Sequence, residues 1–171
     1  MGWLFGTEES KDHRRGKEEQ SRKHNEATRM LADLFIHRNS MVPSDIIARL
    51  EQIHEFDAVP SSEPSEGEPG GYLEQIIKDM SHGSLTADQT GRLVAMLLWP
   101  ELRASEDRSA PSSIVMAAVQ NPHQAYIPPL SAHLASLEKQ LKPHGSSQYQ
   151  TDIASEIRLT KGAIQTCHLR S

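Results

Sequence analysis

The fold of this chain is decided by residues 86–99, TADQTGRLVAMLLW, which combine the start of a helix with seven consecutive apolar residues. Thr86 and Gln89 have the spacing of a capping box, in which each side chain bonds the backbone N–H of the other residue. The apolar run, Leu93 to Trp99, is far shorter than the ~20 residues that a membrane-spanning helix needs. The stretch therefore predicts the most buried helix of the protein, and Pro100 ends it. We expect three of its residues to be among the least accessible in the molecule: Leu93, Leu97 and Trp99.

The helical period continues on both sides of this stretch. Before it, five apolar residues fall on one helical face, which Ser81-His82-Gly83 ends: Tyr72, Leu73, Ile76, Ile77 and Met80. After it, residues 101–109 are polar and predict a loop, and Pro111 begins a short apolar helix that ends before Asn121. Alternating apolar runs are absent, so no strand is predicted.

Two further apolar stripes predict an N-terminal pair of helices. The first lies between residues 18 and 38: Ala27, Met30, Leu31, Leu34 and Phe35. The second follows Ser44, a good N-cap residue: Ile46, Ile47, Leu50, Ile53 and Phe56. The link between them is short, which predicts antiparallel neighbours. The polar residues 8–26 either extend the first helix as a charged arm or are disordered.

Residues 57–71, DAVPSSEPSEGEPGG, interrupt the pattern with three prolines, three glycines, three serines and four acids. They contain almost nothing to bury, so they cannot offset the entropy of ordering them and predict a flexible acidic linker that proteases cleave. The linker divides the chain into a charged N-terminal arm with its helical pair, residues 1–56, and a helical bundle, residues 72–171. The expected fold is all-α, with about six or seven amphipathic helices.

The last two helices are predicted to form a hairpin. Four leucines have the spacing of a coiled-coil seam: Leu130, Leu134, Leu137 and Leu141. Pro129 suits the first position of their helix, and Pro143-His144-Gly145 turns the chain. A matching face follows on a helix from about Ser147 to Leu169: Tyr149, Ile153, Ile157 and Ile164. The seam is either the core of this intrachain hairpin or a contact with another chain.

Composition and charge narrow the classes of function. Of the 171 residues, 36% are apolar and the net charge is −5, with no region basic enough for a nucleic-acid-binding surface. The single cysteine, Cys167, excludes a disulfide scaffold and a structural zinc finger and favours a cytoplasmic location. No Walker loop, dinucleotide fingerprint or nucleophile elbow occurs, so no cofactor is expected. No two of the nine histidines have the spacing of metal ligands on a helix, and we interpret them as scattered surface or partly buried residues.

The N-terminal sequence MGWLFGT is the clearest candidate for a contact with a partner or a membrane. Its three bulky apolar residues precede a basic stretch, a combination that docks at the interface of anionic membranes. Alternatively, the apolar residues pack on the protein itself or on a partner. The N-myristoylation pattern fails because Gly6 stands where Ser or Thr is needed. Six residues are therefore candidate contacts with a partner or a membrane: Trp3, Leu4, Phe5, Arg14, Arg15 and Lys17.

These observations favour a cytoplasmic protein–protein interaction or assembly module without catalytic activity. The alternative is a peripheral membrane protein with a matrix-like or tethering role, docked through residues 1–5. A third hypothesis, a small helical enzyme, requires a deep pocket lined by convergent carboxylates or histidines. The N-terminal pair is too small to fold alone, so it must pack on the C-terminal helices, on a second copy or on another protein. We expect a homo-oligomer, because closed dimers are the commonest soluble assemblies.

Overall fold

The computed structural model describes residues 8–56, 71–142 and 147–170. These residues contain no strand, and the predicted all-α class is confirmed. They form eight α-helices: α1 (Glu8–His37), α2 (Pro43–Phe56), α3 (Tyr72–Ser81), α4 (Ala87–Met96), α5 (Pro100–Ala104), α6 (Ser109–Gln120), α7 (Ile127–Gln140) and α8 (Gln148–Leu169). Two short 3₁₀ helices are also present: η1 (Arg38–Ser40) and η2 (Gln124–Tyr126). The additional helix relative to the expected six or seven is α5, which lies where a loop was predicted.

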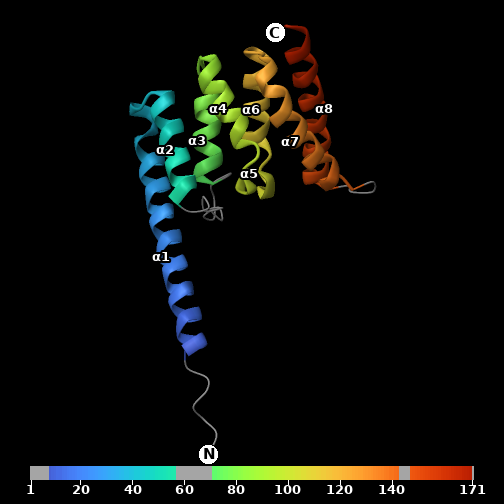
Figure 1. The fold of residues 1–171 in the computed structure, drawn as a ribbon. Helices are drawn as coiled ribbons and strands as arrows, with labels where there is room; N and C mark the ends of the chain where they lie inside the picture. Colours follow the sequence, from blue (N-terminus) through green and yellow to red (C-terminus); the bar gives the residue numbers. More distant parts are fainter. Residues whose placement is uncertain (1–7, 57–70, 143–146, 171) are drawn as a thin grey trace, which may run out of the picture.

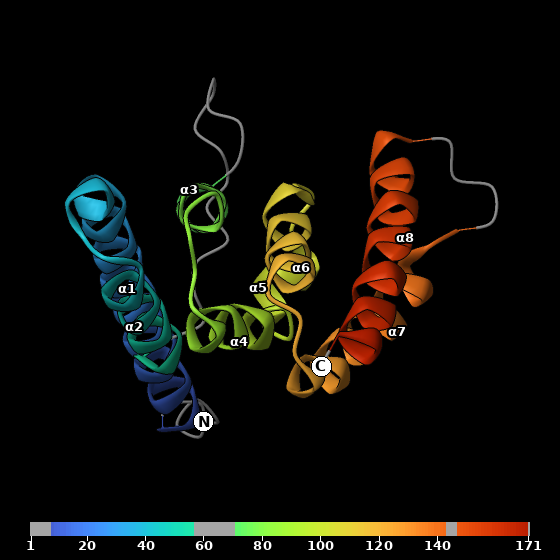
Figure 2. The same cartoon turned by 90° about the horizontal axis from the view of Figure 1, so that it is seen from above.

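The helices cross the body of the molecule in chain order, from α1 and α2 at one end to α7 and α8 at the other (Figure 1). Helices α1, α3, α6 and α8 pack against one another in succession. Helix α2 packs on α1 and α4, and α7 packs on α8 and α4. The view from above shows the same order and places α1 at the edge of the body (Figure 2). Among the described helices, none therefore covers the outer side of α1.

The N-terminal pair packs back on the C-terminal helices. Arg38 Nε donates to Asp79 Oδ2 of α3 at 2.7 Å, and the rings of Phe35 and Tyr72 lie 4.7 Å apart. One cluster of buried apolar side chains runs from Ala27 in α1 to Cys167 in α8. The core is thus continuous across the predicted linker, of which only Gly71 lies within the described residues.

Two predicted helix starts are confirmed. The Thr86 side chain accepts from Gln89 N at 3.2 Å and Thr86 N donates to Gln89 Oε1 at 2.9 Å, which is a complete capping box. The Ser147 side chain caps α8 by accepting from Gln150 N. A short polar side chain that bonds the first free N–H groups is what both sequences supply.

Other predicted helix starts are wrong by a few residues. Helix α2 begins at Pro43, so Ser44 lies inside its first turn rather than at the N-cap. Proline suits the first helical position because its missing N–H needs no partner there. Helix α6 begins at Ser109, before Pro111, and α7 begins at Ile127, which leaves Pro129 as its third residue.

The apolar run from Leu93 to Trp99 is only partly buried and is not one helix. Leu93 and Leu97 are 0% exposed, as predicted. Helix α4 ends at Met96, and Trp99 is extended and half-buried rather than fully buried. Pro100 explains this, because proline disfavours a helical conformation in the preceding residue and then starts α5 itself. The predicted burial of Phe56 is also wrong, since this last residue of α2 is 43% exposed.

Candidate functional site

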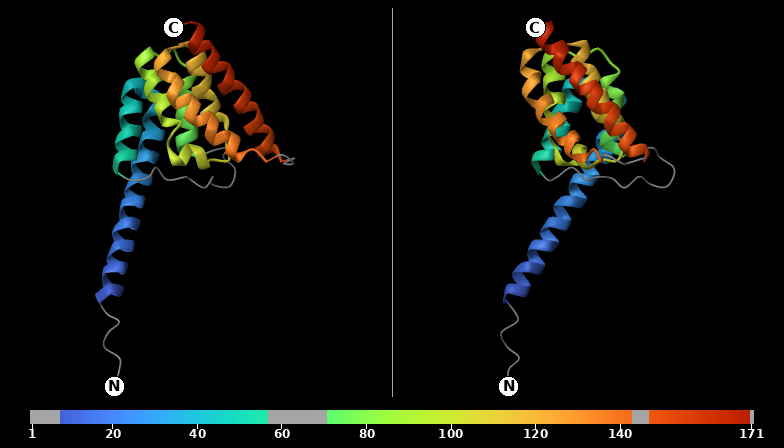
Figure 3. Two further views of the ribbon diagram at one scale, coloured as in Figure 1. Left: turned by 45° about the vertical axis from the view of Figure 1, so that its right-hand side comes forward. Right: turned by 90° about the vertical axis from the view of Figure 1, so that its right-hand side faces the viewer.

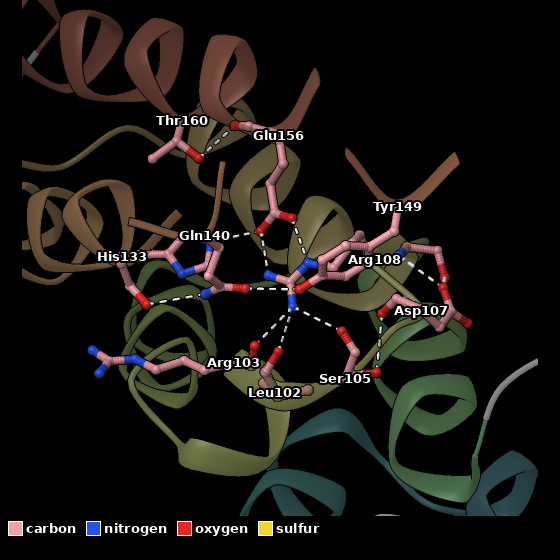
Figure 4. A network of polar contacts seen from close by, with 12 residues as sticks. Leu102, Arg103, Ser105, Asp107, Arg108, His133, Gln140, Tyr149, Glu156 and Thr160 are labelled. Atoms are coloured by element: carbon pink, nitrogen blue, oxygen red, sulfur yellow. Dashed lines mark hydrogen bonds and ion pairs between the residues drawn. The ribbon is translucent and has the colours of Figure 1, made fainter. Parts of the chain in front are cut away.

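A buried ion-pair network joins three distant parts of the chain. Arg108 precedes α6, and its side chain lies against Glu156 of α8 (Figure 4). Arg108 Nε donates to Glu156 Oε2 at 2.8 Å and Nη2 donates to Glu156 Oε1 at 3.0 Å. The two side chains are only 2% and 0% exposed. This paired geometry is the strong form of an arginine–carboxylate contact, and it fixes the start of α6 against α8.

Arg108 also bonds the backbone where α5 ends. Its Nη1 donates to the carbonyl of Leu102 at 2.7 Å and to that of Ser105 at 3.2 Å. The last carbonyls of a helix have no partner within the helix. Arg108 therefore compensates both a carboxylate and the free carbonyls of α5, which accounts for the burial of a guanidinium group.

His133 of α7 completes the network. Its Nε2 lies 2.6 Å from Glu156 Oε1, and its side chain is 2% exposed. An ionised carboxylate only accepts hydrogen bonds, so Nε2 carries the proton. The other ring nitrogen, Nδ1, is buried without a hydrogen-bond partner among the described residues. The interpretation of the histidines as surface or partly buried residues is therefore wrong for His133.

The environment of Glu156 holds it in the charged form. Burial by itself raises the pKa of Glu156, but hydrogen bonds from His133 and Arg108 and their positive charge outweigh it, so the pKa lies below the ordinary value of 4.5. Neither His133 nor Glu156 lines the cavity beside α1 and α2, the groove over α4 or the cavity of about 250 Å³ that Arg108 borders. No group of three potential metal ligands occurs among the described residues. The network thus has the features of a structural lock between α5, α6, α7 and α8.

The sequence held a local signal for two members of this network. Glu156 lies three residues after Ile153 and four before Thr160, on the buried side of α8. His133 has the same position in α7, three residues after Leu130 and four before Leu137. A charged or titratable residue within an apolar stripe indicates a buried polar contact. The partner Arg108 is 48 residues from Glu156 and has no such local signal.

The leucine seam is used inside the chain. Leu130 and Leu137 are 0% exposed, and Leu134 packs with Leu137 on Ile153 and Ile157 of α8. Leu141 is different, because it follows the end of α7 and is 40% exposed. The turn at residues 143–145 lies outside the described residues. The sequence left two interpretations open, a core of the intrachain hairpin or a contact with another chain. The burial and contacts of these three leucines agree with the intrachain hairpin.

The predicted contact residues of the N-terminus divide into two groups. Trp3, Leu4 and Phe5 lie outside the described residues. Arg14, Arg15 and Lys17 belong to α1, whose residues 10–25 are exposed on every side. This part of α1 extends away from the body as an arm in all views (Figure 3). The polar residues 8–25 are therefore helical, and at 1.5 Å per residue they form an arm about 27 Å long.

A groove of about 440 Å³ lies over α4 and was not predicted; its lining includes small apolar residues together with Asp88 and His123. Three small residues, spaced four apart on one face of α4, line it: Ala87, Gly91 and Ala95. The Tyr126 hydroxyl donates to the carbonyl of Ala87 at 2.6 Å and fixes one wall. The opposite wall is the ion pair of Arg92 with Glu51, at 2.6 and 3.0 Å. A Cβ atom on Gly91 would lie 3.3 Å from the Tyr126 ring, so the small residue permits this close packing.

Comparison with protein-family models, with curated proteins and with solved structures found no match for this chain. None of the described helices is long and apolar enough to cross a membrane.

Proposed function

We propose that this chain is a protein–protein interaction or assembly module without catalytic activity, and that the groove over α4 is its binding surface. The observation that carries the proposal is an open groove over α4, with small residues along the helix and Tyr126 and the Arg92–Glu51 ion pair held in place beside them. A groove between packed helices is a common place for a folded protein to accept a helix of another chain. The site of action is the cytoplasm, consistent with a single buried cysteine.

The shape of the groove fits a helix. Ala87, Gly91 and Ala95 leave room along α4 because none of them has a side chain longer than a methyl group. A helix that presents an apolar stripe at three- and four-residue spacing can then approach α4 closely, which is a common mode of peptide recognition. The partner is a different protein or a second copy of this chain.

The buried network supports a binding role rather than a catalytic one. Both oxygens of Glu156 accept hydrogen bonds from Arg108 or His133, and the side chain is 0% exposed, so the carboxylate does not face solvent. A rigid frame lowers the entropy lost when a partner binds. The hypothesis of a small helical enzyme keeps one supporting feature, the buried pair of His133 and Glu156, but a substrate would have to displace enclosing side chains to reach it.

The role of the groove as a binding surface can be tested with a larger, charged side chain that fills it without disturbing the core. Ala95 is exposed in the groove, so Ala95→Glu places a charge there, and Ala135→Glu makes the same change at an exposed position of α7. We expect Ala95→Glu to abolish partner capture from cells, or self-association in sedimentation at micromolar concentration, while Ala135→Glu retains both. Partner sets and sedimentation that are identical for the two variants would exclude the groove as the binding surface.

A further inference from the structure

The arm of α1, residues 10–25, is a helix that is exposed on every side. None of its residues has an apolar side chain, and Gly16, which is unfavourable inside a helix, lies among them. Most helices in proteins are stabilised by the packing of an apolar face. A helix that is polar on every side instead needs many pairs of opposite charge along its own length. The side chains of the arm itself therefore have to supply the interactions that keep it helical.

Opposite charges alternate along one face of α1. The series begins with Asp12, Arg15 and Glu19, and its spacing of three and then four residues repeats. Residues at these spacings are neighbours on the surface of a helix, and opposite charges there stabilise the helix. We call this series the alternating stripe: Asp12, Arg15, Glu19, Arg22, Glu26, Arg29 and Asp33. Every charge within the stripe thus has opposite charges as its neighbours on both sides.

The ion pairs of α1 agree with this pattern. Arg29 Nε and Nη2 donate to the two carboxylate oxygens of Glu26 at 3.1 and 2.6 Å, which is the paired form of the contact. Two further acids of the stripe approach bases four residues later: Glu19 Oε1 lies 3.8 Å from Lys23 Nζ, and Asp33 Oδ1 lies 3.4 Å from His37 Nδ1. In each pair the acid precedes the base, which is the order that the helix dipole favours.

The body of the protein supplies the start of the helix. Ala27, Leu31 and Leu34 of α1 are buried in the core. Forming the first turn is the costly step of helix formation, and each further residue adds a hydrogen bond without that cost. The helix can therefore extend from the packed turns into the arm, where attraction along the alternating stripe offsets the unfavourable effect of Gly16.

The composition of the arm argues against a docking surface. A specific protein interface needs an apolar centre from which Lys and Glu are depleted, and residues 10–25 do not supply one. The alternating stripe itself contains charges of both signs. The lysines outside the stripe do not form one basic surface, because Lys17 and Lys23 are six residues apart and lie on different sides of the helix. A helix with these features is suited to setting a distance.

We propose that the arm is a self-supporting helix that acts as a rigid spacer, and that the alternating stripe keeps it helical. At 1.5 Å per residue, residues 8–25 hold the outer end of α1 about 27 Å from the first buried turn. A flexible chain would leave that distance and its direction variable, whereas a helix fixes both. Any contact made at the outer end of α1 is thereby kept at a set distance from the body. This role does not depend on the groove over α4.

Distances between two spin labels on the full chain test the rigidity of the arm. The labels are attached through His13→Cys in the arm and Ala48→Cys at an exposed position of α2. Cys167 is buried, so the two introduced cysteines take the labels. We expect a narrow distribution of distances, because a continuous helix joins the arm to the body.

Two matched variants test the role of the alternating stripe. Arg15→Glu with Glu19→Arg keeps the composition and the net charge but places like charges next to each other, so the distribution of distances should broaden. Amide exchange in residues 10–25 should become roughly tenfold faster in this swapped variant, since several attractions become repulsions. Arg15→Lys with Arg22→Lys keeps the alternation and should change neither measurement.

Salt gives opposite effects in the two cases. At about 1 M salt, screening should speed amide exchange in the arm of the wild type, because it weakens the attractions. The same salt should slow exchange in the arm of the swapped variant, because it weakens the repulsions. Amides of the body provide the internal control and should respond equally in both chains.

Three outcomes overturn the proposal. A broad distribution of distances in the wild type shows that the arm is not rigid, and equal amide exchange in the wild type and the swapped variant shows that the stripe does not keep it helical. A narrow distribution found only at concentrations where sedimentation detects a dimer shows that a second copy holds the arm. The groove variant Ala95→Glu should leave the distances unchanged, so failure of the spacer is distinguishable from failure of the assembly role.

Discussion

The two ends of this molecule use the same charged residue types in opposite ways. In the arm of α1, ion pairs join neighbours on one helix, such as Lys23 with Glu19 at 3.8 Å, and both side chains are exposed. Near α8, Arg108 and Glu156 come from positions 48 residues apart and are enclosed together. An exposed pair contributes about 0–1 kcal/mol, whereas breaking a buried pair leaves an uncompensated charge. Substitution of charged residues in the arm should therefore change the free energy of unfolding little, whereas substitution in the network should lower it.

The strongest test of this contrast is removal of the charge on Glu156. Glu156→Gln should lower the free energy of unfolding by about 3–5 kcal/mol, because Arg108 then stays buried without a counter-charge. Urea denaturation measures the loss. In the arm, Arg15→Ala with Arg22→Ala should leave the free energy of unfolding within about 0.5 kcal/mol of the wild type.

A triple variant separates charge from packing at the network. Arg108→Met, His133→Leu and Glu156→Leu together replace the network by apolar side chains, and stability should recover part of what Glu156→Gln loses, because the carbonyls of Leu102 and Ser105 still lose their donor. If Glu156→Gln is no less stable than the wild type, the network is not the lock that its geometry indicates.

The packed centre of the molecule provides the next comparison. Leu97→Ala should lower the free energy of unfolding by about 2–5 kcal/mol, since Leu97 is 0% exposed and the change leaves a cavity. Its neighbour Leu98 is 38% exposed, so Leu98→Ala should lower it by less than about 1 kcal/mol. If the two variants lower the free energy of unfolding equally, Leu97 is not more deeply buried than Leu98 and the packing of the turn after α4 is not as described.

Low pH should weaken the contribution of the buried network to stability more than that of the ion pairs in the arm. The pKa of Glu156 is lower in the folded chain than the ordinary 4.5, so its contribution is complete above about pH 4.5 and is lost as pH falls through the folded value. The free energy of unfolding should therefore decrease from neutral pH toward about pH 3. Glu26 at the base of the arm also has a lowered pKa, owing first to its hydrogen bond from Arg29, but its side chain is 41% exposed to solvent, which weakens the effect. Glu26→Gln should leave the acid dependence unchanged, and the triple variant should flatten it.

The sequence predicted the helical class and most of the core because amphipathic helices carry their own period. The stripes of Leu31 and Leu34, of Ile46 and Ile47, and of Leu130 and Leu137 all lie on buried sides. The capping box at Thr86 was also predictable, since its two residues are three apart. These features depend on neighbours in the chain, which sequence patterns describe directly.

The missed features depend on residues that are far apart. The bond of Arg108 to Glu156 and the stacking of His54 on Trp99, with ring centroids 4.1 Å apart, arise only after α2, α5 and α8 have packed. The groove over α4 likewise needs η2 and α2 as walls. The end of the helix before Trp99 is instead a local effect. Pro100 disfavours a helical conformation in the residue before it and also starts the next helix, whereas only the end of α4 was predicted from the sequence.

Two glycines allow the contrast between the ends to be measured with the smallest possible change. Gly16 in the arm and Gly162 in α8 are both helical, and neither would bring an added Cβ within 4 Å of another group. Alanine favours a helix interior over glycine by about 0.5–1 kcal/mol. Because α8 packs on α6 and α7 and unfolds with the body, Gly162→Ala should raise the free energy of global unfolding by about that amount. The arm makes no such contacts, so Gly16→Ala should leave global unfolding unchanged while increasing the helical circular dichroism signal and slowing amide exchange in residues 10–25. A rise in global stability from Gly16→Ala equal to that from Gly162→Ala would mean that the arm unfolds together with the body, which its exposure on every side argues against.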